Sequence, residues 1–320
     1  MKIVFLGTPE FAIPSLEKLL SSNHELLAVV TQTDKPSGRG NKLLPSPVKQ
    51  WSIQHNIKVL QFEKISRDGL EDIKALSPDL MITAAYGQIL SQSIIDIPKF
   101  GIINVHASLL PKYRGASPIQ SAIINGETIT GVTIMQTEAG LDTGDILNVA
   151  KTNIGEEETS GELTERLANI GAELLIKTVD EIEHGTVIRE KQQHSNATIT
   201  TKIKKEDSLI NWNKSSKEIK CLILGTSPDP MARTILNGEL VKISRARENN
   251  EIIAPEGSEN GEIISPSSAK AGVFVKCGQG VIEIVEAQLP GGKLLPAKQL
   301  FGGRKFKLGD RFQAVMFMDL

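Results

Sequence analysis

Short apolar runs alternate with amphipathic stretches over residues 1–190. The runs at 2–6, 26–32, 57–60, 79–85 and 101–106 have the length and the β-branched content of buried strands. Between them, apolar residues recur at helical spacing, most clearly at 160–185, with Leu163, Leu167, Ile170, Leu174 and Val179. Strands that alternate with helices in this order predict βαβ units around a doubly wound, Rossmann-like parallel sheet.

Four sites carry the sequence signature of a helix start. A proline follows a capping residue at Thr8-Pro9, Ser46-Pro47 and Ser117-Pro118. The fourth site pairs Thr159 with Glu162, the spacing of a capping box in which each side chain bonds the other residue's backbone N–H. We expect helices to begin at these points, the first of them running to Leu20.

The chain changes character after residue 186. Residues 186–205 are polar and lack clear periodicity, as is typical of a linker. Beyond them we expect a helix at 215–224 and short strands at 240–246, 261–265, 272–277, 281–287 and 311–316, the pattern of a small OB-like β-barrel. The sequence therefore predicts a first domain at 1–188, a linker at 189–206 and a β-barrel domain at 207–320.

The composition agrees with two folded domains. Of 320 residues, 40% are apolar and 23% are charged, so each domain can bury a core and an intrinsically disordered chain is excluded. Aromatic residues, at 4%, disfavour a protein built on base stacking. No apolar run approaches the roughly 18 residues that span a bilayer, and the start lacks a signal-peptide core, so we expect a cytoplasmic protein with no membrane contact.

Two kinds of cofactor are disfavoured. Cys221 and Cys277 have no metal-binding spacing, so we expect buried thiols, with no disulfide and no metal site. The turn after the first strand, residues 7–12, holds one glycine where a dinucleotide-binding fingerprint needs three, and Pro9 removes a backbone donor. An ordinary strand-to-helix turn is favoured there.

Positive charge is concentrated in the second part of the chain. Residues 1–200 carry 18 Lys and Arg against 24 Asp and Glu, whereas residues 201–320 carry 18 against 14, a net charge of +4. A basic domain can bind a polyanion, and a solvated surface with chance asymmetry is the alternative. Charge alone leaves both interpretations open.

A candidate site begins where the strand at 101–106 ends. Alternation along a strand places Asn104 and His106 on the same face, at the carboxyl edge where open α/β sheets bind ligands. Such a pair also occurs as a purely structural pair in a core. The loop that follows, with Pro111, Arg114 and Gly115, favours the functional interpretation.

A carboxylate between two glycines is the second candidate. Gly140, Asp142 and Gly144 follow the apolar run at 131–137. Aspartate between glycines often forms an Asx-turn without chemistry, and that alternative stays open. Asn104, His106 and Asp142 together supply what acyl transfer to an amine requires: a donor for the oxyanion, a polarising group and a proton acceptor.

These motifs resemble those of the 10-formyltetrahydrofolate-dependent formyltransferases. The resemblance lies in Asn104-Val-His106, in the run from Ser108 to Gly115, and in Gly140-Leu-Asp142-Thr-Gly144. It extends over essentially the whole chain through 5–12, 86–90, 131–136 and 210–212. The loop at 33–47 resembles the loop that distinguishes the family members acting on methionyl initiator tRNA.

The resemblance implies a reaction and its participants. The cosubstrate 10-formyltetrahydrofolate would lie along Tyr86, Gly87, Gln88, Ile89 and Leu90 and beside Ser108, Leu109, Leu110 and Pro111. Asn104 and His106 would stabilise the oxyanion, and Asp142 would orient His106 or take the amine proton through water. Arg39 and Lys42 of the loop, together with the barrel domain, would contact the tRNA. No metal is implied, and we expect a monomer.

The chain departs from the family pattern in two places outside these motifs. The segment from Ile199 to Ile203 lacks the usual Tyr-Ala, and the segment around Asp229 lacks a tryptophan between its prolines. We expect these changes to leave the chemistry intact and to bear on contacts with nucleic acid.

Two other functions fit parts of the sequence. A formyltransferase acting on a nucleotide-linked amino sugar would use the same three residues without needing the loop around Arg39. A non-catalytic RNA-binding protein would leave the combination of Asn104, His106 and Asp142 unexplained. Turnover with charged initiator tRNA and with an amino-sugar nucleotide separates these possibilities.

Overall fold

The chain folds into two compact units. The computed structural model describes residues 1–37, 42–266 and 273–315. The first unit contains Met1–Gly115, Thr130–Thr152 and Thr164–Thr200, and the second contains Ala116–Ile129, Asn153–Leu163 and Thr201–Leu320. Two segments that precede the expected linker thus belong to the second unit, and the domain boundaries at 188 and 206 stay a prediction.

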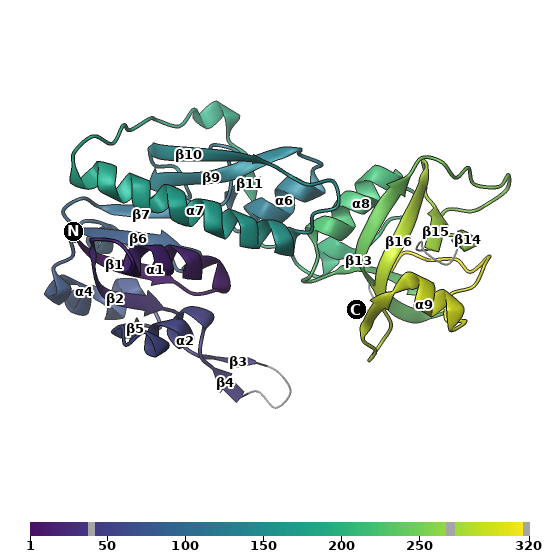
Figure 1. The fold of residues 1–320 in the computed structure, drawn as a ribbon, viewed down its shortest axis with the longest axis horizontal. Helices are drawn as coiled ribbons and strands as arrows, with labels where there is room; N and C mark the ends of the chain where they lie inside the picture. Colours follow the sequence, from purple (N-terminus) through teal and green to yellow (C-terminus); the bar gives the residue numbers. More distant parts are fainter. Residues whose placement is uncertain (38–41, 267–272, 316–320) are drawn as a thin grey trace. The chain divides into compact units, whose positions relative to one another are not determined.

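A seven-stranded sheet forms the centre of the first unit, in the order β10-β9-β7-β6-β1-β2-β5 (Figure 1). The five strands from β5 to β7 run parallel, and β9 pairs antiparallel with β7, so the expected Rossmann-like parallel sheet is confirmed with an antiparallel addition at one side. The strands are β1 Lys2–Gly7, β2 Glu25–Thr31, β5 Val59–Gln61, β6 Leu80–Ala84, β7 Ile102–His106, β9 Ile129–Gln136 and β10 Ile146–Asn153.

Helices cover both faces of this sheet. The helices are α1 Ile13–Leu20, α2 Pro47–Gln54, α3 Ile65–Asp68, α4 Leu70–Leu76, α5 Gln92–Ile95 and α7 Ser160–Glu183. On one face, Val4, Met81 and Ile102 pack in a core with residues of α3, α4 and α5. On the other face α7 lies so close that a Cβ at Gly171 would be 2.9 Å from Val105 Cγ1. No helix among the described residues combines the length and apolarity needed to cross a membrane.

Two of the helix starts are confirmed as capped ends. The Ser46 hydroxyl accepts a hydrogen bond from Lys49 N at the start of α2. Thr159 and Glu162 form the reciprocal bonds of a capping box at the start of α7, which ends at Glu183.

The capping prediction for Thr8 is wrong. Its hydroxyl donates to the carbonyl of Tyr86 at 3.0 Å and accepts from Gln32 N at 3.4 Å, so both of its hydrogen bonds go to neighbouring strand ends and none to a helix N–H. The chain makes a 3-10 turn at Glu10–Ala12 before α1 begins. Ser117 likewise makes no cap: helix α6, Pro118–Ile124, begins after it, but the hydroxyl accepts from Ile203 N.

The expected loop at 33–47 contains a β-hairpin, with β3 at Lys35–Ser37 and β4 at Lys42–Leu44. Its base is fixed by Asp34, whose carboxylate accepts from Lys49 Nζ at 2.8 and 2.9 Å and from Gln61 Nε2 at 2.9 Å. The hydrogen bond from Lys49 is the main cause of a lowered pKa at Asp34. The hairpin therefore starts from a rigid point on the sheet.

The second unit is built on an antiparallel sheet, in the order β12-β13-β16-β15-β14 with β17 paired to β16. Its core includes Trp212 stacked on Phe312, with ring centroids 5.3 Å apart. The elements are α8 Ser216–Gly225, β12 Ala232–Leu236, β13 Glu239–Asn249, β14 Ile263–Pro266, β15 Val273–Lys276, β16 Val281–Gln288, β17 Leu294–Pro296 and α9 Ala297–Gly302. The expected small β-barrel is thus a curled antiparallel sheet, with α8 and α9 packed against it.

One strand expectation in this unit is wrong within the described residues. Residues 311–315 make only isolated bridges, from Arg311 to Glu262 and from Gln313 to Ile235. Phe312 and Val315 are nevertheless buried, Phe312 within the core of this unit. The two cysteines are free and buried as expected, and burial raises the pKa of Cys277 to about 12.

The basic character expected of the second domain is offset in the folded unit. The segments 116–129 and 153–163 add five glutamates, so the second unit holds 18 Lys and Arg against 19 Asp and Glu, a net charge of −1. Arg245 pairs with Glu162 at 2.6 Å and Arg247 with Glu157 at 2.8 Å. Net charge therefore gives no support for polyanion binding by this unit.

We expect Gly171→Leu to lower the free energy of unfolding by about 2 kcal/mol, because a side chain there must push α7 away from Val105 and Val132. Helix propensity alone favours the opposite sign, by nearly 1 kcal/mol. Urea unfolding followed by circular dichroism measures the change. Asn169→Leu, on the exposed side of α7, is the control and should change stability by less than about 0.5 kcal/mol. A more stable Gly171→Leu protein would contradict the close packing.

Candidate active site

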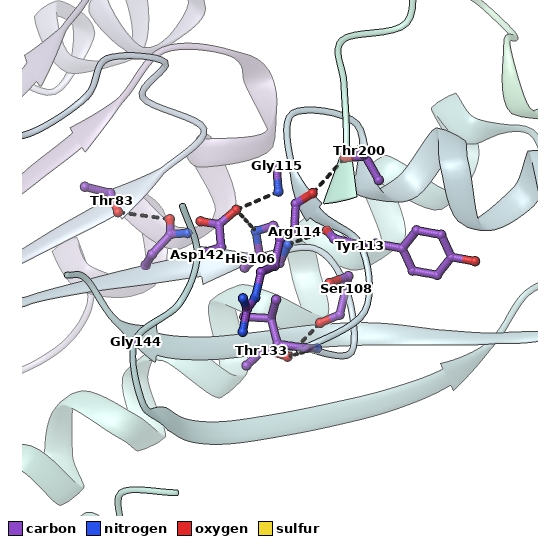
Figure 2. Close-up of polar contacts among 12 residues, drawn as sticks. Thr83, His106, Ser108, Tyr113, Arg114, Gly115, Thr133, Asp142, Gly144 and Thr200 are labelled. Carbon is purple, nitrogen blue, oxygen red and sulfur yellow. Dashed lines mark hydrogen bonds and ion pairs between the residues drawn. The ribbon is translucent and has the colours of Figure 1, made fainter. Parts of the chain in front are cut away.

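Asn104 lies near the carboxyl end of β7, paired in register with Thr83 of β6. The Thr83 hydroxyl donates to Asn104 Oδ1 at 2.9 Å, which fixes the orientation of the amide (Figure 2). The side chain is half-buried, on the face of β7 opposite Val105. Within the described part of the chain the Asn104 Nδ2 group has no hydrogen-bond partner, so its hydrogens can act as donors at the edge of the sheet.

His106 ends the same strand and is buried, with 5% of its surface exposed. Its Nε2 lies 2.9 Å from the carbonyl oxygen of Tyr113, and because a carbonyl only accepts, Nε2 carries a proton. The other ring nitrogen, Nδ1, lies 3.6 Å from Asp142 Oδ2, close enough for an ion pair but too far for a hydrogen bond. The ring is thus oriented by Tyr113, and Nδ1 faces the carboxylate.

Asp142 is held by a partner from a different loop. Its Oδ2 accepts from the backbone N–H of Gly115 at 2.8 Å (Figure 2). Its backbone is left-handed, with a φ of +50°. An Asx-turn is a hydrogen bond from the Asp side chain to the backbone two residues on. The Asp142 carboxylate instead bonds a backbone N–H 27 positions away, so it does not form such a turn. Among the described residues, Asp142 Oδ1 has no hydrogen-bond partner, which leaves one carboxylate oxygen free to take a proton.

The glycines of these loops are required by close approaches. A Cβ at Gly144 would overlap the carbonyl oxygen of Gln136, and a Cβ at Gly115, where φ is +101°, would overlap that of Thr200. Each loop can therefore reach its position only with glycine there. Asn104 and His106 thus come from β7 and Asp142 from the loop that follows β9, while the loop after β7 supplies the Gly115 N–H that holds Asp142.

Comparison with known proteins assigns the chain to a family. Residues 1–179 match the family described as formyl transferase, and residues 202–305 match the formyl transferase C-terminal domain. A methionyl-tRNA formyltransferase of Acetivibrio thermocellus is 45% identical over 97% of this chain and 99% of its own length. One of Geobacter sulfurreducens is 44% identical over 97% of this chain and 96% of its own length.

The chain belongs to the methionyl-tRNA formyltransferase family. A solved sugar 3N-formyl transferase, WlaRD, studied with dTDP and 5-N-formyl-THF, is similar in fold, with a TM-score of 0.66 at 22% identity over 90% of this chain and 97% of that one. At that identity the similarity shows the fold alone. The family resemblance seen in the motifs is confirmed.

The segment Ser108–Pro111, expected beside the folate, is a tightly bonded turn. Ser108 is fully buried, and its hydroxyl donates to the carbonyl of Lys112 at 2.7 Å. Thr133 of β9 donates to the Ser108 carbonyl at 2.6 Å and accepts from Leu110 N at 3.2 Å (Figure 2). Leu109 and Pro111 are half-buried. Because the Ser108 hydroxyl is hydrogen-bonded within this turn, a ligand would contact the backbone of the turn and the side chains of Leu109 or Pro111.

The other expected folate segment, 86–90, follows β6 at the same edge of the sheet. Tyr86 points into the core with 3% of its surface exposed, and its carbonyl accepts from Thr8 and from Gln32. Gly87 has a φ of +81°. Gln88 bonds the backbone of Phe62 and Ile65, whereas Leu90 packs partly on the core. Ile89 is 90% exposed, an apolar side chain with nothing covering it.

Of the two expected tRNA contacts, the structure describes the backbone of Lys42 alone. Arg39 falls outside the described residues, and Lys42 begins β4. Leu43 and Leu44 are 66% and 49% exposed. A cavity of about 520 Å³ lies between this hairpin and the end of β1, lined by residues that include Thr8, Phe11, Gln32, Lys35 and Leu44.

One cluster in the described part of the chain has metal-binding residue types. His24, Asp180 and Glu183 bring their ligand atoms within 4.8 Å of one another. The Met1 amine already lies among them, 2.9 Å from Glu183 Oε1 and 3.2 Å from His24 Nδ1. The cluster is a network of ion pairs, and we assign no metal to it.

Sequence reasoning missed Thr83 and the backbone groups of Tyr113 and Gly115. Thr83 could have been found from the sequence, because it is the polar residue within the apolar run 80–84. In the sheet it pairs with Asn104 of the next strand. The roles of Tyr113 and Gly115 are carried by a carbonyl and an N–H, which no side-chain pattern reports.

We expect the Tyr86 phenol to stay protonated at pH 11 while the chain is folded. Burial raises its pKa to about 12, so the folded form keeps a proton that the unfolded form releases near pH 10. Stability should therefore fall between pH 9 and pH 11, by about 1 kcal/mol from this group. Urea unfolding at both pH values measures the loss. Tyr86→Phe is the control and should lack this part of it, and equal losses in the two proteins would show that the phenol is in water.

Proposed function

We propose that this chain transfers the formyl group of 10-formyltetrahydrofolate to the free amino group of methionyl initiator tRNA. Curated relatives at 44–45% identity over 97% of the chain carry the name of this reaction. Chemically, the proposal rests on one observation: Asn104, His106 and Asp142 lie at the carboxyl edge of the sheet, and no described residue bonds Asn104 Nδ2 or Asp142 Oδ1.

The proposed step forms one C–N bond and breaks another. The amine of the methionyl group attacks the formyl carbon, and the carbonyl oxygen becomes anionic. Asn104 Nδ2 donates to that oxygen, with its amide fixed by Thr83. His106 Nδ1, facing Asp142, adds positive character beside the developing charge when protonated.

Asp142 is proposed as the acceptor of the amine proton. Tyr113 already orients the His106 ring, so a carboxylate is not needed for that task. Asp142 keeps Oδ1 free while Gly115 holds Oδ2, an arrangement suited to taking a proton directly or through one water. The N10 of the departing folate then receives a proton from the same group.

The folate is proposed to lie across the ends of β6 and β7. The exposed Ile89 offers an apolar contact to a ring, and the turn Ser108–Pro111 offers backbone groups beside it. The Tyr86 side chain is buried in the core beneath this edge of the sheet, so it would support the folate site without contacting the folate. The contacts of Gly87, Gln88, Leu90, Leu109 and Leu110 with folate stay predictions.

The hairpin β3–β4 is proposed as the main tRNA contact. It carries Lys35 and Lys42, exposes Leu43 and Leu44, and is anchored through Asp34 and Lys49. The second unit is proposed as a further tRNA contact, which its net charge of −1 does not support. Ile199 and Asp229, where the sequence departs from the family pattern, have exposed side chains. A monomeric state and a cytoplasmic location stay predictions.

A direct assay tests the proposal. The purified chain is given 10-formyltetrahydrofolate with charged initiator tRNA, and separately with a nucleotide-linked amino sugar, and formyl transfer is followed in both. We expect turnover with the tRNA and none with the sugar. Faster transfer to the sugar would establish the alternative function, and no transfer to either would remove the chain from formyl transfer.

We expect Asp142→Asn to lower the rate of formyl transfer by about 100-fold or more, because the variant loses the proton acceptor but keeps the shape of the loop. Single-turnover kinetics measures the rate, and folate binding should be nearly unchanged. Asp145→Asn, in the same loop, is the matched control and should keep its rate within about twofold. An Asp142→Asn enzyme with more than half the parental rate would exclude the role.

We expect KM for charged tRNA to rise steeply with salt, since each neutralised phosphate contributes a slope of roughly 0.7 to 0.9 on logarithmic axes. Arg39→Ala should raise KM for tRNA or lower kcat with it, while leaving KM for folate unchanged. Arg245→Ala, a cation already paired with Glu162, should have a smaller effect on KM for tRNA. A KM for tRNA that is flat between low and moderate salt would contradict the proposed contact.

A further inference from the structure

The segment at residues 190–200, here called the crossing segment, runs back over the candidate active site. It was expected to be part of a linker, yet it is bonded to the first unit at both ends. Glu190 and Ile146 exchange two backbone hydrogen bonds of 2.8 and 2.9 Å, and the Thr198 carbonyl accepts from Arg114 N at 2.9 Å. At its end, strand β11, Ile199–Thr200, pairs in parallel with β8, Arg114–Gly115. The crossing segment therefore touches both loops that supply the site.

Gln192 is the residue through which this segment joins the two loops. It is 6% exposed, and every polar atom of its side chain is used. Its Nε2 donates to the carbonyls of Asp142 at 2.9 Å and of Gly144 at 2.8 Å. Its Oε1 accepts from Arg114 Nε at 3.1 Å and from Nη2 at 2.6 Å. A buried amide with all its hydrogen bonds made has one permitted orientation.

The hydrogen bonds close a ring around Asp142. Gln192 ties the backbone of Asp142 to the side chain of Arg114, while the next residue, Gly115, bonds the Asp142 carboxylate through its N–H. Arg114 is itself 6% exposed, and its other side-chain partner is His194 Nδ1, at 3.1 Å. The backbone of Asp142 is left-handed, at φ +50°, a conformation that few residues other than glycine, asparagine and aspartate adopt.

We propose that Gln192, with Arg114, is a positioning residue for Asp142. It holds the loop 142–144 from the main-chain side so that the carboxylate stays against Gly115 N and 3.6 Å from His106 Nδ1. The proposal rests on the proposed function of Asp142 and adds to it the means by which that residue is placed. It makes a residue of the expected linker part of the active site.

The variant Gln192→Glu separates the two halves of the contact. A glutamate can still accept from Arg114, but it cannot donate to the carbonyls of Asp142 and Gly144. We expect kcat for formyl transfer to fall about 10-fold to 100-fold, with KM for folate within about twofold. Gln193→Ala, at the exposed neighbouring position, is the matched control and should change neither quantity.

The same variant made in the Asp142→Asn protein distinguishes positioning from general destabilisation. If Gln192 acts through Asp142, Gln192→Glu should cost less than about threefold once the carboxylate is gone. An equal loss in both backgrounds, or an unchanged kcat in the single variant, would overturn the proposal. Gln192→Ala is the second variant and should give the same pattern if Gln192→Glu fails to fold.

Hydrogen exchange of the Gly115 amide provides a readout that does not depend on activity. Its N–H is bonded to Asp142 Oδ2, so Gln192→Glu should speed its exchange while leaving exchange in β6 and β7 unchanged. Unchanged protection of Gly115 would overturn the positioning role. The parental rate with methionyl-tRNA, measured in the same series, reports separately on the proposed function.

Discussion

Strand β7 is held between a parallel neighbour, β6, and an antiparallel neighbour, β9, and each neighbour brings one part of the site with it. From β6 comes Thr83, which fixes the amide of Asn104. From β9 comes Thr133, which closes the turn after His106, and beyond β9 the chain returns with Asp142. Because a strand alternates its side chains, Asn104 and His106 face the site while Val105 packs against α7. The order of the strands therefore determines which groups can meet.

The costly element of this arrangement is the loop that carries Asp142. Its aspartate has a left-handed backbone, which Asp tolerates better than most residues with a side chain, and the loop also brings Gly144 against the carbonyl of Gln136. The compensating interactions are a charge-assisted hydrogen bond from Gly115 N and two hydrogen bonds from Gln192. As a result, Asp142 has Oδ2 bonded to Gly115 N, and no described residue bonds its Oδ1. The carboxylate faces Nδ1 of His106, whose Nε2 donates to the Tyr113 carbonyl.

The parts of this structure that could be predicted from sequence are those with local causes. The strands, the caps at Ser46 and Thr159 and the shared face of Asn104 and His106 follow from alternation and from residues within four positions of one another. Thr8 failed as a cap because its partner, Tyr86, is 78 positions away. Gln192 gave no signal, since its contacts span 48 to 78 positions and its neighbours are polar. The net charge of the second unit could not be predicted either, because segments 116–129 and 153–163 join it only through the fold.

We infer from the approach of Asp142 to His106 that the two residues act as one unit, and a double-mutant cycle on formyl transfer to methionyl-tRNA tests this most directly. His106→Ala and Asp142→Asn are measured alone and together by single-turnover kinetics. A pair that works together through Nδ1 and Oδ2, 3.6 Å apart, should lose little more in the double variant than in the more damaging single one. Losses that multiply in the double variant would show two independent residues and would contradict this account of the site.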